Sequence, residues 1–308
     1  MTSDSDGEGT TSETIIRRGF VSIAEGQVHY RHAPGPARAA RPLVMLHASP
    51  GSSLMLAPLI AAFGASRPAY ALDTLGNGDS ARPALADPPL DYFADAHLRA
   101  IDALGLDAFD LYGSHTGGNI ACEIAIRAPE RVRSMILDGM SLYHDAERDE
   151  MLAQYAPAIV PDLNGSQINW VWHFVRDTYM FWPWYRRDPA HARTVGLPSA
   201  DALHEKVVEV LKAVRTYHLS YRAAIAYPKR ERLPLVTVRT LLACAKTDML
   251  ARYTDDVARL LPRAQRLETP GFGTSADAAR TIALFGEFLG REREIDHAAS
   301  TTQYQRGA

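Results

Sequence analysis

The sequence has little of what marks several common classes of protein. Of its 308 residues only two are cysteines, Cys122 and Cys244. A scaffold held by disulfides is therefore excluded, and two buried free thiols in a reducing, cytoplasmic setting are predicted. No apolar run approaches the length that spans a membrane. The formal net charge is −3, which gives no electrostatic basis for binding nucleic acid or an anionic membrane.

The two ends of the chain are polar. Residues 1–13 are rich in Ser, Thr, Asp and Gly, and they lack the basic region and apolar stretch of a signal peptide. They are predicted to be a disordered leader. Residues 291–308 are polar and are predicted to be a frayed C-terminal tail.

What is present is an alternating pattern in residues 14–140 and again in residues 233–290. Segments that favour buried strands, such as Pro42–Leu46 and Phe109–Tyr112, alternate with segments that favour helices, such as Tyr92–Leu104. This alternation predicts an α/β core whose mostly parallel sheet is covered by helices on both faces.

Between residues 141 and 232 the alternation stops and helical patterns dominate, which predicts a helical lid inserted between two strands. All four tryptophans lie in this segment, at Trp170, Trp172, Trp182 and Trp184. Most of these rings are expected to pack the lid onto the core. A lid above a binding site also presents apolar surface to the substrate, and the last three tryptophans are predicted to do so.

The most informative segment is Asp110–Asn119, which reads Asp-Leu-Tyr-Gly-Ser-His-Thr-Gly-Gly-Asn. It has the form of a G-x-S-x-G nucleophile elbow, in which the central residue sits on a strained turn between a strand and a helix. Gly113 and Gly117 are the flanking glycines, so the central residue is His115, and Ser114 is out of register. The architecture of the elbow is kept while its usual nucleophile is absent.

Three further segments follow predicted strands. His47–Ser52 resembles an H-G-x-P-G-x oxyanion loop, Asp73–Ser80 a D-x-x-G-x-G-x-S loop, and Pro270–Thr274 a P-G-x-G-H turn. With the elbow, these motifs make the chain similar to the lid-bearing branch of the α/β-hydrolase superfamily, which includes dehalogenases, epoxide hydrolases and C–C bond hydrolases. The resemblance implies the α/β-hydrolase fold, a doubly wound, mostly parallel sheet of eight strands with a lid after strand six.

The resemblance also assigns catalytic positions, and two of them are changed. The family nucleophile maps to His115, where serine, aspartate or cysteine is expected. The family acid maps to Asp248 and is present, whereas the general-base histidine maps to Thr274. The usual oxyanion donors map to the backbone N–H groups of Ser49 and Thr116.

Two other residues have family counterparts. His47, at the head of the oxyanion loop, is expected to pack structurally. Asp138, at the end of the sixth strand, is an alternative position for the acid in some branches of the family. Asp248 is preferred because its loop matches better.

A serine triad needs a hydroxyl nucleophile within hydrogen-bond reach of an imidazole that a carboxylate orients, so the standard mechanism is excluded. The ring of His115 is instead expected to extend into the volume that the small Thr274 leaves open. There Asp248 would accept the Nδ1–H or the Nε2–H, and the other ring nitrogen would face the pocket. A carboxylate partner fixes the tautomer and raises the basicity of the ring.

The leading hypothesis is a cofactor-free enzyme that uses a His115–Asp248 dyad as general base beside a backbone oxyanion hole. Its reaction would be water-assisted hydrolysis, or C–C lyase or elimination chemistry, on a small apolar carbonyl compound. Covalent catalysis through an acyl-imidazole is a less favoured variant. The competing hypothesis is a family member that has lost catalytic activity and binds a ligand or a protein partner in the former active-site pocket.

The remaining candidates are ligand contacts. His144, just past the sixth strand, and Thr274 are added to the predicted substrate-binding residues. No metal is expected, because no H-E-x-x-H or paired-histidine spacing is present. No cofactor is expected either, because no helix opens with G-x-G-x-x-G. The predicted partner is a small apolar or aromatic molecule, and the sequence leaves its identity and the oligomeric state open.

Overall fold

The structure is a computed structural model that describes residues 14–36 and 40–290. The predicted leader at residues 1–13 and the predicted tail at residues 291–308 lie outside the described residues. Among the described helices, none combines the length and the apolar character needed to cross a bilayer.

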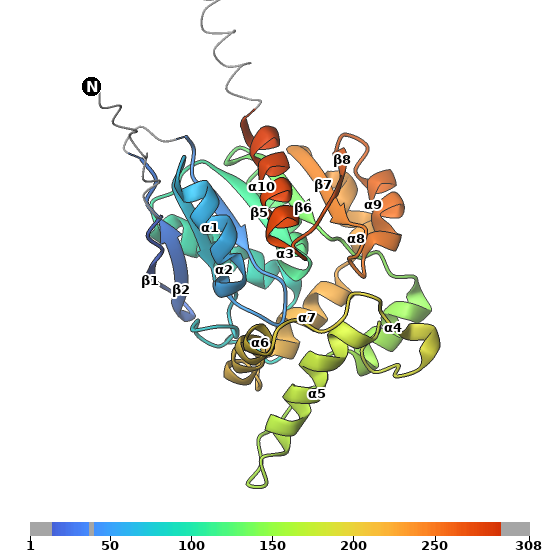
Figure 1. Cartoon of the computed structure of the whole chain (residues 1–308). Helices are drawn as coiled ribbons and strands as arrows, with labels where there is room; N and C mark the ends of the chain where they lie inside the picture. The colour runs from blue at the N-terminus through green and yellow to red at the C-terminus, as the bar shows by residue number, and fades with distance from the viewer. Residues whose placement is uncertain (1–13, 37–39, 291–308) are drawn as a thin grey trace, which may run out of the picture.

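An eight-stranded sheet forms the centre of the molecule (Figure 1), with the strand order β1-β2-β4-β3-β5-β6-β7-β8. The β1–β2 and β2–β4 pairs are antiparallel, and all other neighbouring strands are parallel. The predicted mostly parallel sheet of eight strands is therefore confirmed. The strands are β1 (Arg17–Ile23), β2 (Gly26–Ala33), β3 (Leu43–Leu46), β4 (Ala69–Leu72), β5 (Phe109–Ser114), β6 (Val132–Asp138), β7 (Arg239–Ala245) and β8 (Gln265–Thr269).

Helices cover both faces of this sheet. Along β3, Val44 and Leu46 belong to the apolar cluster that includes residues of α2, α3 and α9, whereas Leu43 and Met45 belong to the cluster with α1 and α10. A strand buried on both faces is apolar at every position, as parallel strands usually are. The core helices are α1 (Ala57–Gly64), α2 (Leu90–Ala103), α3 (Thr116–Arg127), α9 (Thr254–Leu260) and α10 (Ser275–Gly290).

The two cysteines lie inside this core. Cys122 is in α3 and Cys244 is in β7, and both are buried free thiols, which confirms the prediction. Burial raises the pKa of the Cys244 thiol to about 12, so neither its exposure nor its ionisation favours reactivity.

The segment between β6 and β7 consists mainly of helices, and it is called the lid here. Tyr155, Phe174, Trp184 and Tyr217 contribute to an apolar cluster of its own. Figure 1 shows α5 extending away from the sheet, while α7 lies closer to the core. The lid helices are α4 (Asp145–Gln154), α5 (Ser166–Met180), α6 (Ala200–Lys212), α7 (Tyr217–Ala226) and α8 (Lys229–Arg232).

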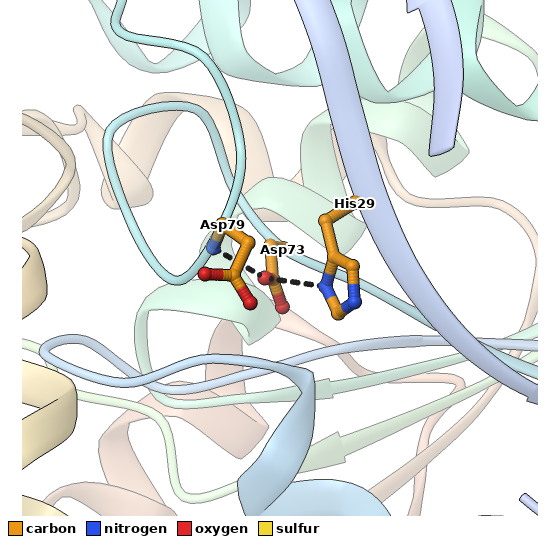
Figure 2. Close-up of side chains that lie close together, drawn as sticks. All are labelled: His29, Asp73 and Asp79. Carbon is orange, nitrogen blue, oxygen red and sulfur yellow. Dashed lines mark hydrogen bonds and ion pairs between the residues drawn. The ribbon is translucent and has the colours of Figure 1, made fainter. Parts of the chain in front are cut away.

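A buried carboxylate connects the loops that follow β3 and β4. Asp73 accepts hydrogen bonds from the backbone N–H of Asp79 (3.0 Å) and from Nδ1 of His29 (2.8 Å) (Figure 2). It also accepts a hydrogen bond from the backbone N–H of Ser53 (2.6 Å). Burial alone would raise the pKa of the Asp73 carboxyl, but the hydrogen bond from His29 and the other donors bring it down to about 2. The ionised carboxylate therefore stabilises the folded state.

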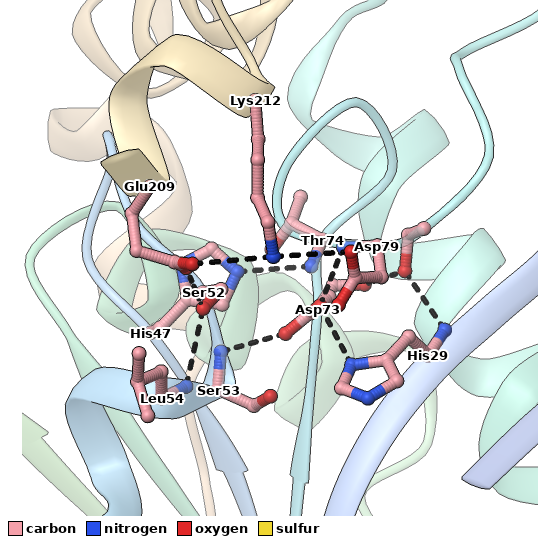
Figure 3. A network of polar contacts seen from close by, with 11 residues as sticks. His29, His47, Ser52, Ser53, Leu54, Asp73, Thr74, Asp79, Glu209 and Lys212 are labelled. Carbon is pink, nitrogen blue, oxygen red and sulfur yellow. Dashed lines mark hydrogen bonds and ion pairs between the residues drawn. The ribbon is translucent and has the colours of Figure 1, made fainter. Parts of the chain in front are cut away.

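The same network reaches the lid (Figure 3). The Ser52 hydroxyl donates to the buried Glu209 carboxylate of α6, and Nζ of Lys212 lies 3.1 Å from Asp79 and 3.4 Å from Glu209. His47 accepts a hydrogen bond at Nε2 from the backbone N–H of Thr74. The loop after β3, the loop after β4 and helix α6 are consequently held together by charged and polar groups.

Replacing Asp73 tests this interpretation. The shift from 3.8 to about 2 corresponds to about 2 kcal/mol of stabilisation that is present above pH 4 and is lost as the pH falls through the lower value. We expect Asp73→Asn to reduce the free energy of unfolding in urea by about 2 kcal/mol at pH 7. The difference from wild type should narrow between pH 5 and pH 2.

The control is Asp102→Asn. The Asp102 side chain is 58% exposed and pairs with Arg131 at the surface, so its loss should change stability by less than about 0.5 kcal/mol. Equal effects of the two substitutions, or a constant deficit of Asp73→Asn at all pH values, would contradict the assignment.

Candidate active site

His115 occupies the tip of the turn between β5 and α3. Its φ is 49° and its ψ is −108°, and it is the only residue other than glycine with a positive φ in the described part of the chain. A Cβ at Gly113 would lie 2.4 Å from the carbonyl oxygen of Gly117, and one at Gly117 would lie 2.3 Å from that of Leu46. The turn is therefore a strained elbow that needs both flanking glycines.

The structure brings the side chains of His115 and Asp248 together. Asp248 lies on the turn after β7, and its Oδ2 is 2.8 Å from Nε2 of His115. Its Oδ1 accepts a hydrogen bond of 2.7 Å from the backbone N–H of Leu250, which fixes the carboxylate. Both side chains remain partly accessible, at 26% for His115 and 21% for Asp248.

His115 and Asp248 each shift the pKa of the other. Burial lowers the pKa of the His115 imidazole, but the charge and the hydrogen bond of Asp248 outweigh burial, so the pKa is raised above 6.5. Burial raises the pKa of Asp248, and the charge and hydrogen bond of His115 outweigh it, so this pKa is lowered. Asp248 is consequently ionised at neutral pH, and the imidazole is a stronger base than a free one.

The backbone beside the dyad leaves no room for a side chain. A Cβ at Gly139 would lie 2.6 Å from Cδ2 and 2.7 Å from Nε2 of His115, and Gly139 has a φ of +73°. The imidazole therefore lies against the Cα of Gly139. Its position depends on this glycine, which no motif marks and whose one signal in the sequence is its place directly after β6.

Asp138, the alternative position for the acid, contacts a different group. Its Oδ2 accepts a hydrogen bond of 2.8 Å from the hydroxyl of Tyr112. Burial raises the pKa of Asp138 to about 6, and the nearby charge of Asp248 acts in the same direction. Two carboxyl groups thus lie near the imidazole, and only Asp248 has its hydrogen bond.

The predicted oxyanion donors come from two segments. Thr116 is the first residue of α3, and Ser49 is buried in the loop after β3. Neither backbone N–H has a hydrogen-bond acceptor among the described residues, as is usual for the first N–H groups of a helix. The hydroxyl of Ser49 lies 3.0 Å from that of Ser220 on α7, which ties this loop to the lid.

His47 is structural, as expected from its place in the motif. It is fully buried, its Nδ1 lies 2.9 Å from the carbonyl oxygen of Ala48, and its Nε2 accepts from Thr74. This pattern requires the neutral Nδ1–H tautomer. Burial lowers the pKa of His47, in agreement with a neutral ring.

Two cavities meet at His115. One is a small cavity of about 30 Å³ below the lid, and the other is a wider cleft of about 610 Å³. The small cavity is lined by His115, Thr116, Asn119, Ser141, Tyr143, Tyr155, Trp182, Tyr221, Ala224, Ile225, Met249 and Leu250. The cleft is bounded by Asp138, Asp248, Tyr112 and Phe272 together with apolar residues of α1 and the lid.

The other predicted contact residues lie in different surroundings. Trp182 lines the small cavity, whereas Trp184 is buried in the lid core and donates from Nε1 to the carbonyl oxygen of Tyr155. Trp172 is 42% exposed, and His144 is exposed where α4 begins. Thr274 is exposed, and its hydroxyl pairs with Asp277 at the start of α10. Of these five residues, Trp182 alone lines either cavity.

The sequence did not predict most of the residues that line the small cavity. Tyr143, Tyr155 and Tyr221 contribute three phenol rings to its wall, and no motif marks them. Asn119 lies within the elbow segment, but the motif assigns it no role. Its position four residues after His115, on the same side of α3, is the one available signal.

Among the described residues, one group could hold a metal ion: His29, Asp73 and Asp79, whose ligand atoms lie within 4.8 Å of one another (Figure 2). Both oxygens of Asp73 already accept hydrogen bonds from protein donors. Asp79 pairs with Lys212, a cation that opposes a metal. We therefore interpret this group as part of the network that holds the loops.

Comparison with known proteins identifies the family. The chain matches the family model described as alpha/beta hydrolase fold over residues 41–275. It therefore belongs to the α/β-hydrolase fold family, as the motifs predicted. It is also similar to the epoxide hydrolase from an endophytic Streptomyces, with a TM-score of 0.68 and 16% identity over 91% of this chain and 96% of that one. At this identity the likeness concerns the fold alone.

Curated relatives match over a shorter segment. The chain is 41% identical over 104 residues to the 2-hydroxymuconate semialdehyde hydrolase of Pseudomonas sp. (strain CF600), covering 32% of this chain and 36% of that protein. It is 34% identical over 118 residues to the carboxylesterase YbfK of Bacillus subtilis (strain 168), covering 38% and 39%. The chain thus matches little more than a third of the length of either relative.

The contact between His115 and Asp248 can be tested by titration. Without the Asp248 charge, burial is the largest remaining influence on the imidazole and lowers its pKa. We expect the His115 pKa to lie above 6.5 in the wild type and to fall below 6.5 in Asp248→Asn. Nuclear magnetic resonance of the histidine side chains measures both values, and an unchanged His115 titration would contradict the contact.

The steric role of Gly139 gives a second test. We expect Gly139→Ala to displace the imidazole, weaken its hydrogen bond to Asp248 and lower the His115 pKa. Gly105→Ala is the matched control, because Gly105 has a φ of +69° and an added Cβ there would have no atom within 4 Å. Both variants should lose about 1–2 kcal/mol of stability from the left-handed backbone. A His115 titration that is the same in both variants would exclude the steric role.

Proposed function

We propose that this chain is an enzyme in which His115, oriented by Asp248, acts as general base on a small apolar carbonyl compound. The reaction is hydrolysis or C–C bond cleavage, with an oxyanion held by the backbone N–H groups of Ser49 and Thr116. The observation that carries the proposal is the distance of 2.8 Å between Nε2 of His115 and Oδ2 of Asp248, at the place where the family has its nucleophile.

This contact determines which nitrogen reacts. An ionised Asp248 accepts a hydrogen bond, so the neutral imidazole carries its proton on Nε2 and its lone pair on Nδ1. Nδ1 has no hydrogen-bond partner among the described residues and is free to accept a proton. The imidazolium that forms is stabilised by Asp248, which is the role of the carboxylate in a serine triad.

The oxyanion would form at the N-terminus of α3. Unpaired N–H groups and the helix dipole make this end of a helix favourable for negative charge. The N–H of Thr116 belongs to this end, and the N–H of Ser49 comes from the loop after β3. A base beside two such donors supports a reaction in which negative charge develops on a carbonyl oxygen.

The cleft supports a small, largely apolar substrate. Its volume of about 610 Å³ is within the range of small-molecule sites. Leu56, Leu59 and Phe272 contribute apolar surface beside His115 and Asp248. The names of the relatives, a semialdehyde hydrolase and a carboxylesterase, agree with a carbonyl-containing substrate.

The proposal is tested by replacing the base. Wild type, His115→Ala and the control His204→Ala, in which an exposed histidine of α6 is removed, are assayed on 4-nitrophenyl esters and on β-diketones. Loss of a positioned general base costs about 10²–10⁴-fold in rate, so kcat should fall by this amount in His115→Ala alone. Equal rates of His115→Ala and wild type would overturn the proposal and favour a binding protein.

The pH dependence of kcat/KM tests the proposed base independently. Nδ1 accepts a proton only when the imidazole is neutral, so kcat/KM should rise with pH through the raised pKa of His115, above 6.5. In Asp248→Asn the midpoint should move to lower pH while the plateau falls. A profile that decreases with pH across this range would contradict a basic role.

A further inference from the structure

A pocket of about 230 Å³ lies where the loop after β4 meets the lid. It is called the junction pocket here, and it shares no lining residue with the two cavities that reach His115. The loop contributes Gly76, Gly78, Ser80 and Arg82, and the lid contributes Leu211, Lys212, Val214, Arg215 and Thr216.

The charged residues of the junction pocket all have the same sign. Arg82, Lys212 and Arg215 are basic, and no acidic residue of the described chain lines the pocket. Lys212 is already paired, with Asp79 at 3.1 Å and with Glu209 at 3.4 Å (Figure 3). The net positive charge of the pocket therefore comes from the two arginines.

Both arginines are available to a ligand. Arg82 and Arg215 are exposed, and neither has an ion pair or a hydrogen bond with another described residue. The whole chain has a formal net charge of −3, so this positive pocket is not part of a generally basic surface. A pocket lined by charges of one sign concentrates their potential and attracts the opposite charge.

Contacts across the pocket fix its two sides relative to each other. The Thr216 hydroxyl donates a hydrogen bond of 2.6 Å to the carbonyl oxygen of Gly76, and Lys212 reaches Asp79. A Cβ at Gly76, whose φ is +79°, would lie 3.1 Å from Cβ of Thr216, so the loop approaches the lid closely here. A pocket that is formed before its ligand arrives costs less conformational entropy on binding.

The loop adds a backbone donor to the charged side chains. Gly78 has a φ of +57°, and its N–H has no acceptor among the described residues. The hydroxyl groups of Ser80 and Thr216 are not further donors, because each already donates to a backbone carbonyl oxygen. The donors that remain for a ligand are the two guanidinium groups, the third N–H of the Lys212 ammonium and the N–H of Gly78.

This set of donors fits a phosphoryl group better than a carboxylate. One guanidinium group can satisfy both oxygens of a carboxylate, so two of them exceed what it accepts. A phosphoryl group offers three acceptor oxygens and about two negative charges. The volume of about 230 Å³ leaves room for a second phosphoryl group or a small organic part. A single pocket does not provide the extended basic surface that nucleic acid needs.

We propose that the junction pocket binds a small phosphorylated molecule, whose phosphoryl oxygens accept hydrogen bonds from Arg82 and Arg215. Because the pocket is built from both sides of the junction, its ligand connects the lid to the loop after β4. The pocket is separate from His115 and Asp248, so this inference does not depend on the proposed general base.

Calorimetric titration of the full chain with inorganic pyrophosphate, at low ionic strength, tests the site. We expect one binding site per chain. In Arg82→Gln and in Arg215→Gln the Kd should rise about tenfold or more, because each variant loses a charge-assisted hydrogen bond. Both side chains are exposed, so both variants should fold.

The matched controls are Arg133→Gln and Arg263→Gln, which remove exposed arginines that do not line the junction pocket. They should bind pyrophosphate with the Kd of wild type. Absence of binding to the wild type, or equal losses in the controls and in the pocket variants, would overturn the proposal.

Citrate tests the class of the ligand. Its carboxylates spread the negative charge over a larger molecule, so at the same ionic strength it should bind about tenfold more weakly than pyrophosphate. Citrate that binds as tightly as pyrophosphate would contradict the assignment of a phosphoryl group.

Hydrogen–deuterium exchange locates the bound pyrophosphate without reference to activity. Exchange of the backbone amides should slow in residues 76–82 and 211–216 and stay unchanged in α5. Slower exchange confined to any other part of the chain would refute the placement. The activity of His115→Ala has no influence on this result, so either proposal can fail while the other stands.

Discussion

The site depends on one hydrogen bond, from Nε2 of His115 to the carboxylate of Asp248. It fixes the ring on a strained turn, selects Nδ1 as the free nitrogen, and keeps one negative charge beside a base of raised pKa. Gly139 permits the contact sterically, and Leu250 holds the carboxylate in place. Without Asp248 the imidazole would be a partly buried, less basic ring with no defined tautomer.

Hydrogen bonds and ion pairs connect the loops and the lid around this site. The buried Asp73 joins the loop after β3 to the loop after β4, and Glu209 and Lys212 extend this network to the lid. A small cavity below the lid and a wider cleft both reach His115.

Local sequence patterns were sufficient for the sheet and the elbow, because turn glycines and alternating apolar runs act over a few residues. The contact of Asp248 with His115 was expected from the family resemblance. Local patterns did not identify the short helix α1, whose residues are apolar on nearly every side, or the phenols of the small cavity. Tyr155 and Tyr221 come from different parts of the lid, and only tertiary packing brings them to His115. Nor could the sequence decide between Nδ1 and Nε2, since that choice depends on ring orientation at the elbow.

The most direct test of the dyad is the tautomer of His115 in the wild-type protein, measured by ¹⁵N nuclear magnetic resonance above the pKa of the ring. We predict a proton on Nε2, held by Asp248, and an unprotonated Nδ1. A neutral imidazole with its proton on Nδ1 would contradict this mechanism, because the nitrogen assigned as base would then be unable to accept a proton.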